Sequence, residues 1–314
     1  MTTEPTATLA LLDELEPVVE ANLNRHLATA KEWFPHEYVP WSQGRDFDGV
    51  LGGEAWEPGQ SKLSDVARTS LIVNLLTEDN LPSYHHEIAT IFGRDGAWGT
   101  WVHRWTAEEG RHGVAIRDYL LATRAVDPVA LERARMTHME GGFANSYEGL
   151  IESVAYVSFQ ELATRVSHRN TGTASGDPLC EQLLVKVAND ENLHMIFYRN
   201  LLNAAFDVAP NASMRAVTKV AKSFQMPGHT IENFGRKSVQ IAMAGIYDLR
   251  QHHDDVLAPV LRQVKAFERT GLTGDGEAAR EELSKYLADL DTQASRFVER
   301  RDATRARQSA RAAV

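Results

Sequence analysis

Two copies of a Glu-x-x-His spacing supply the first candidate chemistry in this chain. They are Glu109 with His112 in "TAEEGRH" and Glu191 with His194 in "ANDENLH". Residues at i and i+3 share one face of a helix, so each pair could present a carboxylate and an imidazole to the same ion. Either pair alone is commonly a solvated surface pair, and the surrounding segments must decide between the two interpretations.

Each pair is preceded, at almost the same distance, by a further glutamate. Glu78 in "LLTEDNLPSY" lies 31 residues before Glu109, and Glu161 in "VSFQELATRVSH" lies 30 residues before Glu191. In an antiparallel helix hairpin, residues equally far from the turn lie opposite each other. At about 1.5 Å per residue, all four carboxylates are predicted roughly 20–25 Å from their turns. The residues predicted to converge at one height are Glu78, Glu109, His112, Glu161, Glu191 and His194.

This set of ligands predicts the kind of metal. Four carboxylates and two imidazoles suit a pair of iron or manganese ions, because carboxylates bind and bridge hard cations and imidazole suits iron. One Glu from each of two helices and Glu-x-x-His from two others is the arrangement of ferritin-like di-iron proteins. The neighbouring acids Glu108 and Asp190 lie about 100° around their helices from the ligands and are not predicted to bind metal directly.

The elements that must position these groups are predicted to be helices. Long apolar-periodic stretches are separated by Gly and Pro, and short alternating strands are absent. The expected fold is all-α, a ferritin-like four-helix bundle with additional flanking helices. Bundle helices are predicted at about 62–92, 98–122, 144–170 and 178–206, with a crossover at 123–143 that contains a short helix. Pro82 could either end the first of these helices or distort it beside Glu78.

The remaining segments are predicted to flank the bundle within one domain, 1–314. Its core bundle spans about 62–206, its N-terminal helix and ordered loop occupy 1–61, and its C-terminal helices occupy 207–314. The N-terminal helix is predicted at 6–30, the loop at 31–60, and the later helices near 211–223, 228–256, 256–270 and 276–308.

Composition excludes several classes of protein. The net charge of −10 and pI near 5.7 argue against nucleic-acid binding. No run of 18 apolar residues occurs, so no membrane span is expected. The start of the chain lacks the features of a signal or transit peptide, and Cys180 is the only cysteine. Both observations predict a reducing, cytoplasmic location.

Five motifs resemble those of the soluble acyl-acyl carrier protein desaturases, in order over roughly residues 30–235. They are "TEDNLPSY", "RWTAEEGRHG", "SFQELATRVSHRNT", "NDENLH" and "MPGH". The resemblance implies a homodimer with two iron ions per chain, Fe²⁺ in the reduced state. It also implies O₂-dependent insertion of a cis double bond into a fatty-acyl chain carried on acyl carrier protein, with electrons from a ferredoxin-type donor.

The resemblance also implies roles for individual residues. One iron would take Glu78 and His112 with Glu109 bridging, and the other would take Glu161 and His194 with Glu191 bridging. Thr164 would handle protons or oxygen at the iron. Asp190 would link Trp33 to His112 as a route for electrons, although plain packing of Trp33 is an equal alternative. Thr90 and Ile91 are candidates for the wall of an acyl tunnel.

Carrier docking and some alternatives stay open at this stage. An acidic carrier protein requires a local basic face, and the candidates are Arg215, Lys219, Lys222, Arg236 and Lys237, or the Arg-rich tail from Arg296. No match to the family is evident after about residue 245. Another di-iron oxygenase (a hydroxylase or N-oxygenase) acting on a carrier-bound substrate, or a non-catalytic ferritin-like iron-binding protein, would also fit the ligands. Acyl chain length, double-bond position and the choice between general lipid and specialised metabolite are left open.

Overall fold

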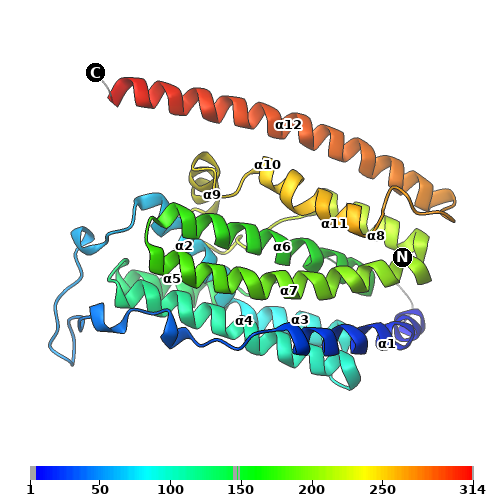
Figure 1. Ribbon diagram of the computed structural model, residues 1–314, viewed down its shortest axis with the longest axis horizontal. Coiled ribbons are helices and arrows are strands. Elements are labelled where there is room, and N and C mark those ends of the chain that lie inside the picture. The colour runs from blue at the N-terminus through cyan, green and yellow to red at the C-terminus, as the bar shows by residue number, and fades with distance from the viewer. Residues whose placement is uncertain (1–4, 144–146, 148, 313–314) are drawn as a thin grey trace.

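Four long helices form the predicted bundle in the computed structural model, which describes residues 5–143, 147 and 149–312. Figure 1 shows them side by side, with the N-terminal helix along one side, where it packs against α4 and α7. Within the described residues helices are the only extended secondary structure, and a single isolated bridge joins Phe47 and Glu54. The bundle helices are α2 (Asp65–Asp79), α4 (Gly96–Ala122), α6 (Leu150–Ser175) and α7 (Pro178–Val208), and the N-terminal helix is α1 (Pro5–Thr29).

The helix predicted at 62–92 is two helices rather than one. Helix α2 ends at Asp79, and α3 (Leu81–Phe92) follows after Asn80. Pro82 lies in the first turn of α3, where its missing N–H costs no helical hydrogen bond. Pro82 therefore marks a helix boundary that falls immediately after Glu78.

The turn that joins α6 to α7 is tighter than predicted. Helix α6 continues to Ser175, and Gly176 adopts a left-handed conformation with φ 65° that ends it. Asp177 then caps α7, because its carboxylate accepts the backbone N–H of Leu179 at 2.9 Å. At the other end of α6, the predicted start at 144 falls in a stretch where residues 144–146 and 148 lie outside the described residues.

The N-terminal loop is ordered, as its composition suggests, and Arg124 is the reason. This buried side chain donates to the backbone carbonyls of Arg45, Asp46, Glu54 and Ala55. The crossover contains the expected short helix, α5 (Pro128–Gly141). Short helical turns within the loop are η1 (Pro35–Glu37), η2 (Trp41–Gln43) and η3 (Pro58–Gln60).

The prediction of one continuous helix at 228–256 is wrong. Gly245 has a positive φ of 73°, and the Asp248 carboxylate caps a new helix through the N–H groups of Arg250 and Gln251. The chain therefore breaks into shorter pieces. The helices of this region are α8 (Pro210–Ser223), α9 (Phe234–Met243), α10 (Leu249–Gln251), the π-helical η4 (His252–Leu257) and α11 (Ala258–Gln263).

A long C-terminal helix, α12 (Gly274–Ala312), runs the length of the molecule over α8, α10 and α9 (Figure 1). Its buried apolar side chains are few, namely Ala279, Leu283, Leu290 and Ala294. No helix among the described residues is long and apolar enough to cross a membrane.

Candidate metal centre

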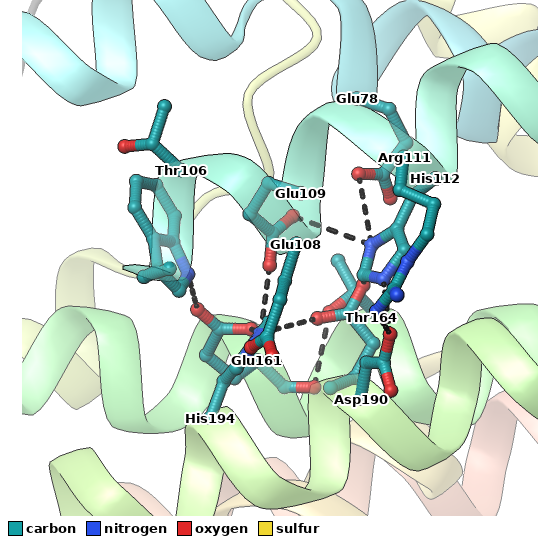
Figure 2. Close-up of polar contacts among 12 residues, drawn as sticks. Glu78, Thr106, Glu108, Glu109, Arg111, His112, Glu161, Thr164, Asp190 and His194 are labelled. Carbon is teal, nitrogen blue, oxygen red and sulfur yellow. Dashed lines mark hydrogen bonds and ion pairs between the residues drawn. The ribbon is translucent and has the colours of Figure 1, made fainter. Parts of the chain in front are cut away.

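The six predicted ligands lie together in the middle of the bundle, and all are buried. Glu78 comes from α2, and Glu161 from α6, while α4 and α7 each contribute one Glu-x-x-His pair (Figure 2). Their ligand atoms form two groups in which every atom lies within 4.8 Å of the others. One group is Glu78, Glu109, His112 and Glu191, and the other is Glu109, Glu161, Glu191 and His194. Glu109 and Glu191 belong to both groups, as two bridging carboxylates would.

Unpartnered buried atoms show that the cluster fits metal ions. His112 Nδ1 lies 3.5 Å from Glu109 and 3.6 Å from Glu78, and His194 Nδ1 lies 3.6 Å from Glu161. His112 Nδ1 and Glu191 Oε1 are buried without a hydrogen-bond partner, whereas His194 Nδ1 forms a buried ion pair with Glu109 Oε1 at 2.8 Å. Each unpartnered buried atom costs about 1–3 kcal/mol, and a cation that His112 Nδ1 and Glu191 Oε1 both coordinate would satisfy them.

Each histidine is held from behind, so that Nδ1 faces the centre. His112 Nε2 lies 3.3 Å from Asp190, and His194 Nε2 lies 2.9 Å from Glu108. Such a carboxylate fixes the ring orientation and tautomer of a metal-binding imidazole.

Asp190 connects His112 to Trp33, as the resemblance implies. The Trp33 Nε1–H donates to Asp190 at 2.8 Å, and its ring lies nearly parallel to that of His112 with centroids 6.5 Å apart. Arg111 donates to the same carboxylate at 2.6 Å and covers the Trp33 ring. Trp33, Asp190 and His112 are therefore in continuous contact from the N-terminal loop to the centre.

Sequence reasoning did not identify Glu108 as a functional residue, because it considered Glu108 only as a direct metal ligand. Its Oε2 accepts from both His194 and His26, each at 2.9 Å, while Arg104 pairs with its other oxygen. The positive charge of Arg104 disfavours a metal ion at Glu108. Glu108 therefore serves as a hydrogen-bond acceptor that connects His26 to His194. The signal was present, since an acid precedes the Glu in both "AEEGRH" and "NDENLH".

His168 was also missed. It follows Glu161 by seven residues, two helical turns further along the same face of α6. Its Nε2 lies 2.9 Å from Glu78, and its Nδ1 lies 3.3 Å from the Asn74 amide. Burial alone would lower the pKa of His168, but hydrogen bonds with Glu191 and Glu78 raise it to about 9. His168 thus clamps the Glu78 carboxylate from the side away from His112.

Crowding of the carboxylates has an electrostatic consequence. Burial, followed by the neighbouring Glu191, raises the pKa of Glu161 to about 8. Burial raises the pKa of Glu109 as well, with a contribution from Glu161. For Glu78 burial acts in the same direction, but hydrogen bonds with His112 and His168 prevail and lower its pKa. Divalent cations would relieve the repulsion among these groups.

Two apolar pockets flank the cluster. One, of about 90 Å³, is lined by Thr77 and Thr164 beside the carboxylates and by Met226, Phe234, Ile241 and Tyr247 beyond them. The other, of about 30 Å³, is lined by Tyr84, Trp105, Phe143, Tyr156 and Val157. Trp105 also donates to Glu161 at 2.9 Å, so this pocket too borders the centre.

Three further residues singled out by the resemblance lie at different places relative to these pockets. Thr164 lies at the pocket wall, with its hydroxyl donating to the backbone carbonyls of Gln160 and Glu161. Thr90 and Ile91 line neither pocket; Thr90 is exposed and Ile91 packs against the core. Ile91 lies one turn beyond Ile88 on the same face of α3 as Tyr84 and Ile88, which border the smaller pocket, whereas Thr90 lies on another face.

Comparison with known proteins places this geometry in a family. A family model described as fatty acid desaturase matches residues 7–314. A Mycobacterium tuberculosis protein described as a candidate acyl-acyl carrier protein desaturase, DesA1, is 54% identical over 297 residues, covering 92% of this chain and 88% of its own. The chloroplastic stearoyl-acyl carrier protein 9-desaturase of Spinacia oleracea is 27% identical over 319 residues, covering 94% of this chain and 77% of its own.

A solved structure matches as well. The X-ray structure of the candidate acyl-acyl carrier protein desaturase DesA2 from M. tuberculosis H37Rv superposes with a TM-score of 0.70 at 32% identity, covering 87% of this chain and 99% of its own. The family match extends through α12, so the limit near residue 245 inferred from the motifs was too narrow. The all-α ferritin-like fold, the buried carboxylate–histidine cluster and these matches together show that the chain belongs to the fatty acid desaturase family.

Proposed function

We propose that the protein is an O₂-dependent desaturase that inserts a cis double bond into a fatty-acyl chain carried on acyl carrier protein. The observation that carries this proposal is the pair of overlapping carboxylate–histidine groups, buried between two apolar pockets. Membership of the desaturase family and the names of its relatives support the same reaction and the same carrier.

The proposed metal centre contains two iron ions per chain, Fe²⁺ in the reduced state. Glu78 and His112 would hold one ion, and Glu161 and His194 would hold the other, because each pair occurs in only one of the two groups. Glu109 and Glu191 occur in both and would bridge. Bound iron supplies the O₂ activation and oxidising power that removal of hydrogen from an unactivated methylene requires.

The residues of the chain position the reactants around that centre. The apolar pockets would hold the acyl chain against the cluster and exclude water, so that the choice of carbons follows from position. The Thr164 hydroxyl, at the wall of the larger pocket, would handle protons or oxygen at the iron. Trp33 and Asp190 would conduct electrons to His112, since their contacts run without a gap from the N-terminal loop.

The proposed reaction also requires partners. Two electrons per turnover would come from a ferredoxin-type donor in the cytoplasm, and the protein would act as a homodimer, as the resemblance to the family implies.

The test is to load the protein with iron and supply acyl carrier protein charged with a panel of acyl chains, a reducing system and O₂. Mass spectrometry should find a product lighter by two hydrogens, with the double bond at one position. Glu109→Ala should lose iron and activity together, whereas Glu140→Ala, at an exposed position, should keep both.

Other outcomes would contradict the proposal. A product heavier by one oxygen would identify a hydroxylase or N-oxygenase instead. Two irons per chain without any product across the panel would indicate an iron-binding protein.

A further inference from the structure

The structure brings two Arg- and Lys-bearing segments together beside the larger apolar pocket. We propose that acyl carrier protein docks on the α9–α12 basic face, an inference that rests on the proposed function. This face is defined by Arg236 and Lys237 of α9 and by Arg300, Arg305 and Arg307 of α12.

Direct contacts join the two helices. The Arg305 Nε–H donates to the carbonyl of Met243, the last residue of α9, at 3.0 Å. Four residues earlier, Arg301 pairs with the buried carboxylate of Asp248 at 2.5 Å. These contacts hold the C-terminal half of α12 against the end of α9, as Figure 1 shows.

The positive charge of this face is not neutralised locally. Residues 296–312 contain six arginines against Glu299 and Asp302. Within the part of the chain that the structure describes, none of these five cations forms an ion pair with a carboxylate. Arg305, Arg307 and Lys237 donate only to backbone carbonyls, those of Met243, Ala303 and Glu232.

The other candidate basic face is neutralised. Arg215, Lys219 and Lys222, on α8, are each paired with an acid. Their partners are Asp275, Glu152 and Glu282. These three cations therefore serve to fasten α8 to α12 and α6, which leaves the α9–α12 basic face as the positive surface for an acidic partner.

The basic face lies on the outer side of the helix that covers the larger pocket. Phe234, Ser238 and Ile241 of α9 line this pocket, while Arg236 lies on the opposite face of the same helix and Lys237 lies at the edge of the pocket face. The far wall includes Thr77, which precedes Glu78 in the sequence. The larger pocket therefore lies between the helix that carries Arg236 and the metal centre, and would receive an acyl chain from a carrier docked on α9.

The charge of the α9–α12 basic face favours acyl carrier protein as its binding partner. Acyl carrier protein is strongly acidic, and this chain has a net charge of −10, so most of its surface repels such a partner. A local positive face is then required for steering, and charges of this kind act mainly on association rate and on specificity.

A charge-reversal variant tests the docking surface. The triple variant Arg236→Glu/Arg300→Glu/Arg307→Glu changes three exposed side chains and leaves Arg301 and Arg305 in place. The matched control is Arg94→Glu/Arg133→Glu/Arg262→Glu, with the same change in net charge at exposed sites elsewhere. Affinity for acyl carrier protein bearing an 18-carbon chain is measured by titration at two ionic strengths.

The first triple variant should bind the carrier at least about tenfold more weakly than the wild type, with a smaller salt dependence, whereas the control should stay within about threefold. The KM for the acyl carrier protein should rise with little change in kcat. Iron content and melting temperature should match those of the wild type.

Three results separate the possible failures. Equal losses in both triple variants, or none in either, would overturn the docking surface while desaturation by the wild type stands. Carrier binding without any double bond would overturn the proposed function while the docking surface stands. Loss of binding to phosphatidylglycerol vesicles, with carrier affinity unchanged, would show that the face meets anionic lipid instead.

Discussion

At the scale of residues, the two histidines of the centre are supported by similar but unequal neighbours. The imidazole of His112 is hydrogen-bonded to Asp190, and that of His194 is hydrogen-bonded to Glu108. Asp190 also accepts from Trp33 and Arg111. Glu108 in turn contacts His26 and Arg104. The two metal positions therefore share a plan but contact indoles differently: Trp33 donates to Asp190, which supports His112, whereas Trp105 donates directly to Glu161.

Glu108→Gln tests the support of His194. The amide can no longer accept strongly from two imidazole N–H groups, so the affinity for the ion at His194 should fall about 10–100-fold, while the ion at His112 is retained. Titration with Co²⁺, followed by its visible absorption, resolves the two binding events. Glu140→Gln serves as the control, and two unchanged binding steps in Glu108→Gln would refute the role.

Trp33→Phe tests the predicted electron route. Phenylalanine preserves most of the packing but removes the N–H that donates to Asp190, so reduction of the bound iron by an external donor should slow at least about tenfold. Iron content should stay the same. Stopped-flow absorption measures the rate, and a rate equal to that of the wild type would support plain packing of Trp33 instead.

Much of the candidate site could be predicted from the sequence because it depends on helix geometry alone. The i, i+3 spacing and the equal distances from two turns brought six side chains together without knowledge of any neighbour. The contacts of Glu108, His168 and His26 depend on how α1 packs against α4 and α7 and on how α2 packs against α6, which no spacing within one helix reveals. Their assignment as supports, like that of the six ligands, stays a prediction until metal binding is measured.

At the scale of elements, periodicity located most helices to within a few residues. Periodicity predicted one continuous helix at 62–92 and another at 228–256, but in each range one helix ends and another begins within the apolar-periodic stretch. The causes are local: Asn80 separates two helices beside Pro82, and Gly245 with Asp248 ends one helix and caps another. The extent of the single domain, 1–314, stays a prediction.

Arg301→Ala should loosen the region where α12 meets α10. The Asp248 side chain is only 1% exposed, so removing its partner leaves a buried carboxylate without its cation. Such a loss costs about 3 kcal/mol of unfolding free energy. Urea denaturation measures it, with Arg300→Ala as an exposed control that should change stability by less than about 0.5 kcal/mol. Equal midpoints in the two variants would contradict this account.

At the scale of the whole molecule, stability should depend on pH through His252. This side chain is 8% exposed, stacks on Phe224, and lies 2.9 Å from the Tyr247 hydroxyl. Burial, with a contribution from His253, lowers the pKa of His252 from 6.5 to about 4. The unfolded chain therefore takes up this proton first, so the stability is present above pH 6.5 and is lost as pH falls towards 4.

His252→Gln should remove that dependence. Between pH 7 and pH 5 the wild type should lose about 2 kcal/mol more unfolding free energy than the variant, because one pKa unit corresponds to about 1.36 kcal/mol. Urea midpoints of the metal-free proteins at pH 7, 6 and 5 provide the measurement. Parallel losses in both proteins would exclude His252 as the cause.

The attachment of α12 has a consequence for how such proteins diversify. Among the residues whose side chains the structure describes, this helix contributes four buried apolar side chains, and ion pairs along its length also fasten it to the molecule. None of its residues takes part in the metal cluster, among those the structure describes. Substitutions on the exposed face of α12 can therefore change its surface charge without disturbing the metal cluster. Relatives could in this way come to bind different carrier proteins on the proposed docking surface while they keep the same metal ligands.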